Sequence, residues 1–148
     1  EMTDEQWSKV LDITLTGTFR CIRAVARRMV AARTRGVIVN NASVIGWRAQ
    51  EDQAHYAAAK AGVMALTRSA AMDLAGHGIR VNAVSPSLAM HPFLEKVTTP
   101  ELLEQLKARE AFGRAAEPWE VANVMVFLAS GYSSYMTGEV VSVSSQHA

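Results

Sequence analysis

The feature that most constrains the fold is a strand, a helix and a second strand that follow one another in the middle of the chain. Residues 36–43 (Gly-Val-Ile-Val-Asn-Asn-Ala-Ser) predict a short buried strand that ends in Ser43. An alanine-rich helix then runs to the glycines at residues 76 and 78, and residues 79–85 predict the second strand. This order predicts a parallel βαβ unit within an α/β fold. Ligands of such sheets bind at the carboxyl ends of the strands, where Ser43 and Pro86 lie.

The flanking segments add helices on both sides of this unit. Thr3 and Gln6 form a capping-box pattern, which predicts a helix from residue 3 to about residue 32, loosened near residue 14 and residues 16–18. Pro100 and Pro118 suit the first positions of two further helices, the second ending near residue 129. A loop is expected between residues 86 and 98, and a last strand over residues 139–143.

Tyr56 and Lys60 are the residues whose spacing points most clearly to chemistry. They stand four residues apart, so their side chains share one helix face. A phenol has a pKa of about 10, and a neighbouring cation favours the phenolate and lowers that value. The hydroxyl of Ser43 could then hydrogen-bond a carbonyl oxygen while Tyr56 passes it a proton, the acid–base half of a hydride transfer. The spacing alone also fits an exposed helix pair, with Lys60 solvated and the ring of Tyr56 packed.

Several motifs in sequence order resemble those of the short-chain dehydrogenase/reductases. They are residues 40–46 (Asn-Asn-Ala-Ser-Val-Ile-Gly), 56–62 (Tyr-Ala-Ala-Ala-Lys-Ala-Gly) and 79–86 (Ile-Arg-Val-Asn-Ala-Val-Ser-Pro). Residues 127–130 and 136–141 resemble the final helix and strand of that family, so the resemblance spans the chain. It implies that Tyr56 is the general acid/base, that Ser43 orients the substrate oxygen, and that Lys60 lowers the pKa of Tyr56 and holds the nicotinamide ribose.

The same resemblance makes the absence of one motif informative. Members of the family open with a strand and a glycine-rich turn that lays the cofactor pyrophosphate on a helix N-terminus. The nine glycines of this chain form no such cluster. We therefore interpret residues 1–148 as a single partial domain, the C-terminal part of a Rossmann-like doubly wound parallel sheet of roughly 250 residues. The implied cofactor is NAD or NADP, and the residues that choose between them are absent.

Three positions near the predicted site depart from the family pattern. Thr14 stands where the family usually has an asparagine that holds a water beside the lysine, so it either replaces that residue or weakens the relay. Ser87 and His91 stand where a glycine and a cofactor-contacting threonine are usual. His91 could hydrogen-bond a carboxamide or a phosphate, or be a plain loop histidine. The implied cofactor-binding residues are Tyr56, Lys60, Pro86, Ser87, Leu88 and His91.

Apolar side chains in the two loops beside the site are candidates for contact with the substrate. They could line an apolar pocket together with Ser43, or they could staple the loops to the core. The second loop most resembles family members that act on bulky acyl or polycyclic ketones. The chain ends in Ser-Ser-Gln at residues 144–146, where the family often has Asp-Gly-Gly at a subunit interface. The candidate substrate residues are Trp47, Met90, Phe93 and Leu94.

Composition narrows the class of partner. The net charge of +1 indicates no nucleic-acid footprint, and no apolar run is long enough to span a membrane. The single Cys21 excludes an internal disulfide and fits a reducing compartment, so we expect a cytoplasmic protein acting on a small ketone or alcohol. No second histidine lies at metal-ligand spacing from His55, so no metal is expected.

The quaternary structure and two rival functions stay open at this stage. The resemblance implies a homodimer or homotetramer that pairs copies of the alanine-rich helix and of the helix from residue 3 to about residue 32, with Val63 and Ala65 expected at the interface. One rival function is an inactive fragment or scaffold half that cannot bind cofactor alone. The other is an unrelated α/β binding module in which the spacing of Ser43, Tyr56 and Lys60 is accidental.

Overall fold

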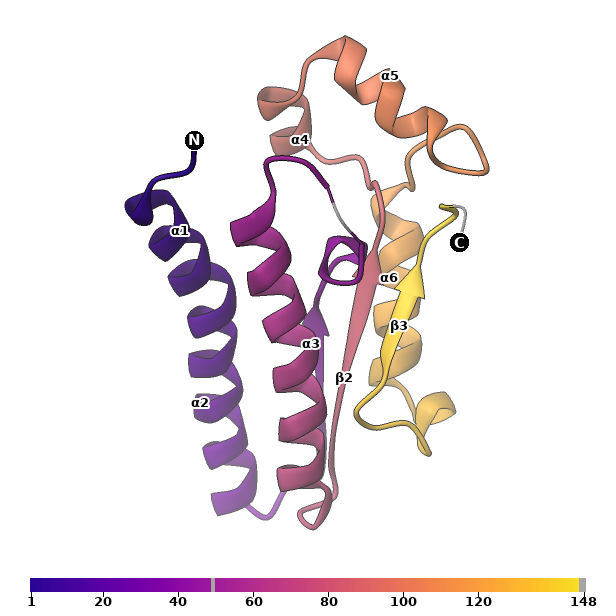
Figure 1. Ribbon diagram of the computed structural model, residues 1–148. Coiled ribbons are helices and arrows are strands. Elements are labelled where there is room, and N and C mark those ends of the chain that lie inside the picture. The colour runs from indigo at the N-terminus through magenta and orange to yellow at the C-terminus, as the bar shows by residue number, and fades with distance from the viewer. Residues whose placement is uncertain (49, 147–148) are drawn as a thin grey trace.

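A parallel sheet lies at the centre of the protein. The computed structural model describes residues 1–48 and 50–146, without the side chains of residues 93, 95 and 97. Strands β1 (Gly36–Asn41), β2 (Ile79–Pro86) and β3 (Val140–Val143) pair in that order, all parallel. Their arrowheads point to the same end of the molecule, where α4 and α5 lie (Figure 1). The predicted α/β fold with a parallel sheet is therefore confirmed.

The N-terminal segment is one long rod made of three pieces. Helix α1 (Asp4–Leu11) continues through a π-helical turn (Asp12–Thr16) into α2 (Gly17–Ala31), as Figure 1 shows. The predicted capping box is present, because Thr3 Oγ1 accepts from the Gln6 backbone N–H at 3.2 Å and Gln6 Oε1 accepts from the Thr3 N–H at 2.9 Å. The π-helical turn includes residues 14 and 16, where the sequence predicted loosening, whereas residues 17 and 18 lie in the regular helix α2.

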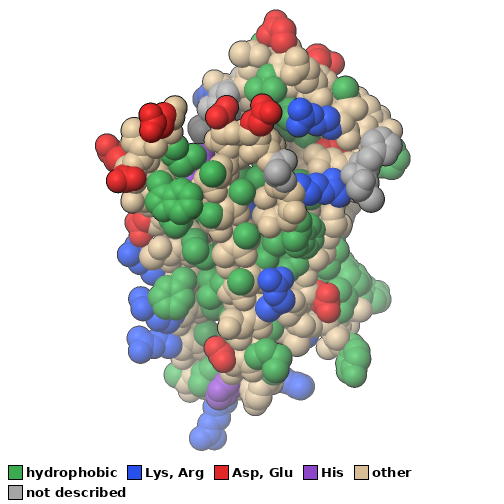
Figure 2. Space-filling view, in the orientation of Figure 1, with side chains coloured by type: hydrophobic (Ala, Val, Ile, Leu, Met, Phe, Trp, Pro, Cys, Tyr) green, Lys and Arg blue, Asp and Glu red, His purple; other side chains and the backbone are tan. Residues whose placement is uncertain are grey.

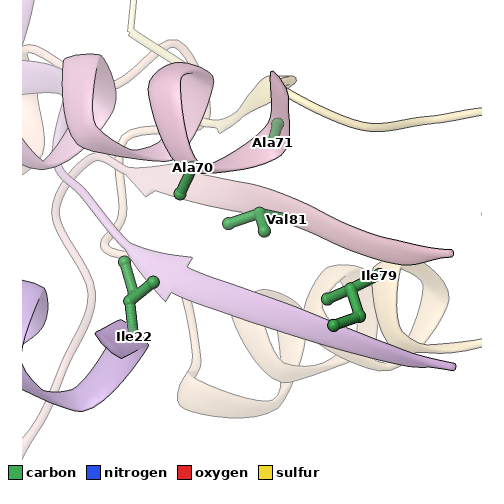
Figure 3. Packing of buried hydrophobic residues seen from close by; sticks show 5 residues of the cluster. All are labelled: Ile22, Ala70, Ala71, Ile79 and Val81. Atoms are coloured by element: carbon green, nitrogen blue, oxygen red, sulfur yellow. The ribbon is translucent and has the colours of Figure 1, made fainter. Parts of the chain in front are cut away.

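Helices cover both faces of the sheet. Helix α3 (Ala54–Ala75) packs on β2 beside the α1–α2 rod, and α6 (Pro118–Ala129) covers the opposite face (Figure 1). Small side chains let α3 approach the strands closely, as Figure 3 shows for Ala70 and Ala71 beside Val81. Each apolar side chain of Val or Ile size that is buried here stabilises the fold by about 1.5–3 kcal/mol.

A second core cluster overturns one expectation about α3. Val63 is fully buried and packs with Ala42, Met64 and Ala83. Val63 therefore belongs to the core of the subunit. The expectation that it lies at an interface between subunits is wrong. Ala65, two residues further along α3, is exposed. The difference arises because the helix turns by about 100° per residue, so that neighbouring small residues face opposite sides.

The chain beyond β2 forms two short helices above the carboxyl ends of the strands. Helix α5 (Pro100–Ala108) begins at the predicted proline, with Thr99 Oγ1 accepting from Leu102 N–H at 3.2 Å. Helix α4 (Pro92–Val97) lies where only a loop was predicted. Its N-cap is His91, whose Nδ1 accepts from Leu94 N–H at 3.1 Å, and histidine is not among the usual N-cap residues. Of the helices that the structure describes, none is long and apolar enough to cross a membrane.

Candidate active site

Ser43 and Tyr56 come together where β1 ends and α3 begins. Ser43 follows β1 and caps a 3-10 turn (Val44–Gly46), its Oγ accepting from Ile45 N–H at 3.3 Å. Tyr56 lies in the first turn of α3, which packs against this 3-10 turn. The Ser43 hydroxyl lies close enough to the Tyr56 hydroxyl to favour its phenolate form, and both side chains line the same cavity. The fold therefore unites two hydroxyls that the sequence places thirteen positions apart.

Burial dominates the acidity of Tyr56. The loss of hydration of the phenolate raises the pKa of Tyr56 above 10.0, and the hydrogen bond with Ser43 offsets only part of that rise. Lys60 is not among the causes of this shift, so its predicted effect on the pKa of Tyr56 stays a prediction. In the structure the phenol is stabilised in its protonated form.

Lys60 lies between the end of β1 and the ring of Tyr56. Its Nζ donates to the backbone carbonyl of Asn41 at 2.7 Å and lies 5.5 Å from the centre of the Tyr56 ring. The ammonium therefore faces the ring and the end of β1. Burial lowers the pKa of Lys60. Both side chains are partly buried, so the alternative of an exposed, solvated pair does not describe them.

A cavity of about 560 Å³ opens beside this pair, at the carboxyl ends of the strands. Its position agrees with the general rule for ligand sites in open α/β sheets. Both polar and apolar side chains line it. The predicted site residues on its wall are Ser43, Tyr56, Pro86, Ser87, Leu88, His91 and Leu94.

Much of the apolar wall was not foreseen from the sequence. It comes from α5 and α6, which are more than forty residues from Tyr56 along the chain. The only sequence signal for this wall is the set of apolar residues spaced by one helical turn in α6, and this spacing is equally typical of a helix face packed in the protein core. These wall residues are Leu102, Leu106, Pro118, Val121, Ala122 and Met125.

Four of the remaining predicted residues lie off the cavity wall. Lys60 reaches the strand end beside Tyr56, and Thr14 lies in the π-helical turn that packs against α3. Trp47 is half exposed at 49%, and Met90 is partly buried. The side chain of Phe93 lies outside the described residues.

Two loop residues in the predicted cofactor set already have partners. The Ser87 hydroxyl donates to Glu110 Oε2 at 3.0 Å, and the Leu88 N–H donates to Glu110 Oε1 at 3.3 Å. Ser145, in the tail after β3, donates to the same carboxylate at 2.8 Å. Glu110 is only 4% exposed, so this buried acid ties the ends of β2 and β3 together. The sequence signal for this buried cluster was that Ser87 and Ser145 stand where the family that the chain resembles has glycines.

The arrangement can donate a proton to an oxygen atom held in the cavity. A protonated phenol and a serine hydroxyl face the same space, and a carbonyl oxygen can accept from both. Among residues 1–48 and 50–146, no three His, Cys, Asp or Glu side chains gather as a metal site would require.

Comparisons with known proteins place this site in a wider context. A family model described as Enoyl-(Acyl carrier protein) reductase matches residues 1–145. A relative from Mycobacterium tuberculosis, (5R,7aS)-5-hydroxy-7a-methyl-1-oxo-2,3,5,6,7,7a-hexahydro-1H-indene-carboxyl-CoA reductase, is 64% identical over 99% of this chain and 56% of its own length. The 3-oxoacyl-(acyl-carrier-protein) reductase FabG of Thermotoga maritima is 43% identical over 96% of this chain and 57% of its own length.

The structural comparison agrees. A solved structure of 4-hydroxyisoleucine dehydrogenase complexed with NADH superposes with a TM-score of 0.92 at 28% identity, covering 99% of this chain and 60% of that one. The chain thus spans little more than half the length of the curated relatives that it matches.

Proposed function

Because the chain belongs to the short-chain dehydrogenase/reductase family, we propose that it carries the acid–base half of an NAD(P)-dependent oxidoreductase. The proposed reaction interconverts a ketone and a secondary alcohol. The observation that carries this proposal is that Ser43 and Tyr56 lie side by side on the wall of one cavity at the carboxyl ends of parallel strands. A reductase of this kind needs a proton donor for the oxygen that becomes the alcohol.

In the direction of reduction, the substrate carbonyl oxygen accepts hydrogen bonds from Ser43 and Tyr56. As negative charge develops on that oxygen, Tyr56 transfers its proton and Ser43 keeps its hydrogen bond. The raised pKa of Tyr56 keeps the phenol protonated at neutral pH, which suits this role. In the direction of oxidation the phenolate must accept the proton, so that direction gains from alkaline pH. The nicotinamide cofactor, when bound, supplies or receives the hydride at the carbonyl carbon.

The residues at the strand ends fit the nicotinamide half of such a cofactor. Lys60 donates one of its three N–H groups to Asn41, which leaves donors for a ribose hydroxyl. Thr14 would support a water beside Lys60 in place of an asparagine. The glycine-rich turn that would hold the pyrophosphate is not among the motifs of this chain. Residues that would contact NAD or NADP are Tyr56, Lys60, Pro86, Ser87, Leu88 and His91.

The substrate we propose is a thioester with a bulky, apolar acyl group. Two relatives are named for substrates on coenzyme A or on acyl carrier protein, and one of those substrates is a fused-ring ketone. The apolar wall supplied by α5 and α6 offers such a group a place to bind, with Leu94 on the same wall. Trp47, Met90 and Phe93 stay predictions as substrate contacts.

Replacing one hydroxyl tests the proposed role of Tyr56. In an enzyme that joins this chain to a nucleotide-binding half, Tyr56→Phe should lower turnover of a 3-oxoacyl thioester by at least about 100-fold, because general acid catalysis is lost. Consumption of NADH or NADPH, followed by absorbance, measures the rate. Tyr132→Phe is the matched control, since Tyr132 is 91% exposed in a turn after α6 and does not line the cavity.

Two results would contradict the proposal. Near-normal turnover by Tyr56→Phe would remove Tyr56 from the reaction. If no ketone is reduced even when tight dinucleotide binding is shown by titration, the chain would instead be a scaffold half without catalytic function.

We also propose that the subunits assemble through the face formed by α1, α2 and α3. Figure 2 shows hydrophobic side chains spread over these helices. Single exposed apolar residues are common, but several on adjacent helices indicate a contact surface. The exposed large apolar side chains there are Trp7, Ile13, Phe19, Val25 and Met72.

A further inference from the structure

A second, smaller cavity adjoins the reaction cavity on the side of α5. Its volume is about 220 Å³. Most of its wall is shared with the reaction cavity, and only two of its lining residues, Arg48 and Arg109, do not also line the larger space. The smaller cavity therefore extends the larger one toward two cationic side chains. The shared residues are Val44, Ile45, Gln50, Leu106 and Gln146.

The two arginines come from different parts of the chain. Arg48 follows the 3-10 turn that Ser43 begins, and Arg109 is the C-cap of α5. The Nη1 of Arg48 donates to Gln146 Oε1 at 2.8 Å, which holds this guanidinium across from the tail that follows β3. Both side chains are exposed at the mouth of the cavity, so a ligand that leaves the reaction cavity on this side meets them.

Local carboxylates do not neutralise these charges. Within the part of the chain that the structure describes, no ion pair involves Arg48 or Arg109. Glu110 follows Arg109 directly, yet its carboxylate is turned inward and accepts from Ser87, Leu88 and Ser145. The cavity thus has apolar side chains on its inner wall and two guanidinium groups at its mouth, each with N–H donors available for a ligand.

We propose that Arg48 and Arg109 bind a phosphate of the phosphopantetheine carrier of the substrate. This inference rests on the proposed function, because it takes the substrate to be an acyl thioester. A guanidinium presents a planar fork of donors that matches phosphate oxygens bidentately. The acyl group occupies the apolar cavity beside Ser43 and Tyr56, and the pantetheine arm leaves between α5 and the C-terminal tail.

A pair of substrates separates phosphate recognition from the reaction itself. One is a 3-oxoacyl-CoA, and the other is the N-acetylcysteamine thioester of the same acyl group, which has no phosphate. For Arg48→Gln combined with Arg109→Gln, kcat/KM for the CoA ester should fall by about 10- to 100-fold, mainly through KM, as expected for lost charge-assisted hydrogen bonds. The phosphate-free thioester should react as before. Arg27→Gln, on the exposed surface of α2, is the matched control and should leave both rates unchanged.

The outcomes are distinguishable. An equal fall for both thioesters would mean that the arginines only maintain structure, which overturns the proposal. A fall in kcat/KM for the CoA ester but not for the phosphate-free thioester supports the proposal. If kcat/KM for the acyl-(acyl-carrier-protein) substrate falls as much as that for the CoA ester, the effect is assigned to the phosphate shared by both carriers. A fall with the carrier protein alone would overturn phosphate recognition in favour of contact with that protein.

A binding measurement covers the case in which no thioester is reduced at all, which would contradict the proposed function. Coenzyme A is then titrated into the protein by calorimetry at low salt. Affinity that drops at least about 10-fold in the double arginine variant supports the phosphate site independently of activity. No binding, or equal affinity in both proteins, overturns it.

Discussion

Removal of the Glu110 carboxylate is the perturbation for which the structure allows a magnitude to be worked out. Glu110 is buried and accepts from three donors: the hydroxyls of Ser87 and Ser145 and the backbone N–H of Leu88. Glu110→Ala removes the acceptor from all three and leaves a cavity. A buried donor without a partner costs about 1–3 kcal/mol, and truncation of a large buried side chain to alanine costs about 2–5 kcal/mol.

These costs overlap, because the two hydroxyls can rotate toward other acceptors whereas the Leu88 N–H cannot. We therefore expect Glu110→Ala to lower the free energy of unfolding by about 3–5 kcal/mol, or the melting temperature by roughly 10 °C. Glu110→Gln keeps the shape and one acceptor oxygen for Leu88, so its cost should be about 1–2 kcal/mol. The order of the two variants follows directly from the number of donors left without an acceptor.

Urea denaturation followed by far-ultraviolet circular dichroism measures these free energies. Glu104→Ala is the matched control, because Glu104 lies on α5, six residues before Glu110, in an exposed pair with Lys107 and should contribute no more than about 0.5 kcal/mol. Adding Ser87→Ala and Ser145→Ala to each Glu110 variant completes a mutant cycle, in which we expect coupling of about 0.5–3 kcal/mol. If Glu110→Ala unfolds within about 0.5 kcal/mol of the unmodified protein, the carboxylate does not tie the strand ends together.

Further predictions concern Tyr56, Glu120, Gly46 and Ala65. Burial raises the pKa of Tyr56 in the folded protein, so the free energy of unfolding that this group contributes is fully present below pH 10.0 and declines as pH rises through the folded pKa. Tyr56→Phe should therefore lose less stability than the unmodified protein when unfolding is measured across this alkaline range. Hydrogen bonds from Arg114, and to a lesser extent from the Glu117 backbone N–H, hold the pKa of Glu120 at about 2. Arg114→Leu should therefore raise the titration midpoint of Glu120 measured by NMR. An unchanged midpoint would contradict this. A Cβ at Gly46 would lie 3.0 Å from the Ala61 backbone N, so Gly46→Ala should destabilise the turn after Ser43 by about 1–3 kcal/mol, whereas Gly76→Ala, with open space around it, should not. Ala65→Glu should dissociate an oligomer without unfolding the subunit, and sedimentation of the unmodified protein as a monomer would refute the proposed interface.

Local sequence signals determined most of the secondary structure. The capping box of Thr3 and Gln6, the prolines at the starts of α5 and α6, and the apolar runs of the strands each act within a few residues, so their outcome does not depend on the rest of the fold. Helix α4 escaped prediction because its N-cap is His91, whose ring nitrogen replaces the usual hydroxyl or carboxylate. The π-helical turn could only be anticipated as a weakness in a long helix.

The sequence also indicated where the proposed site lies, because Ser43 follows β1, Pro86 ends β2 and Tyr56 lies in the first turn of the helix between these strands. Only the tertiary structure decided the acidity of Tyr56. The sequence offered a nearby cation, whereas packing around the phenol supplied the desolvation that raises its pKa. The wall from α5 and α6, the buried carboxylate of Glu110 and the position of Val63 in the core were decided in the same way. Each depends on contacts between segments distant in sequence, and the free energy of burial is set by what surrounds a group in space.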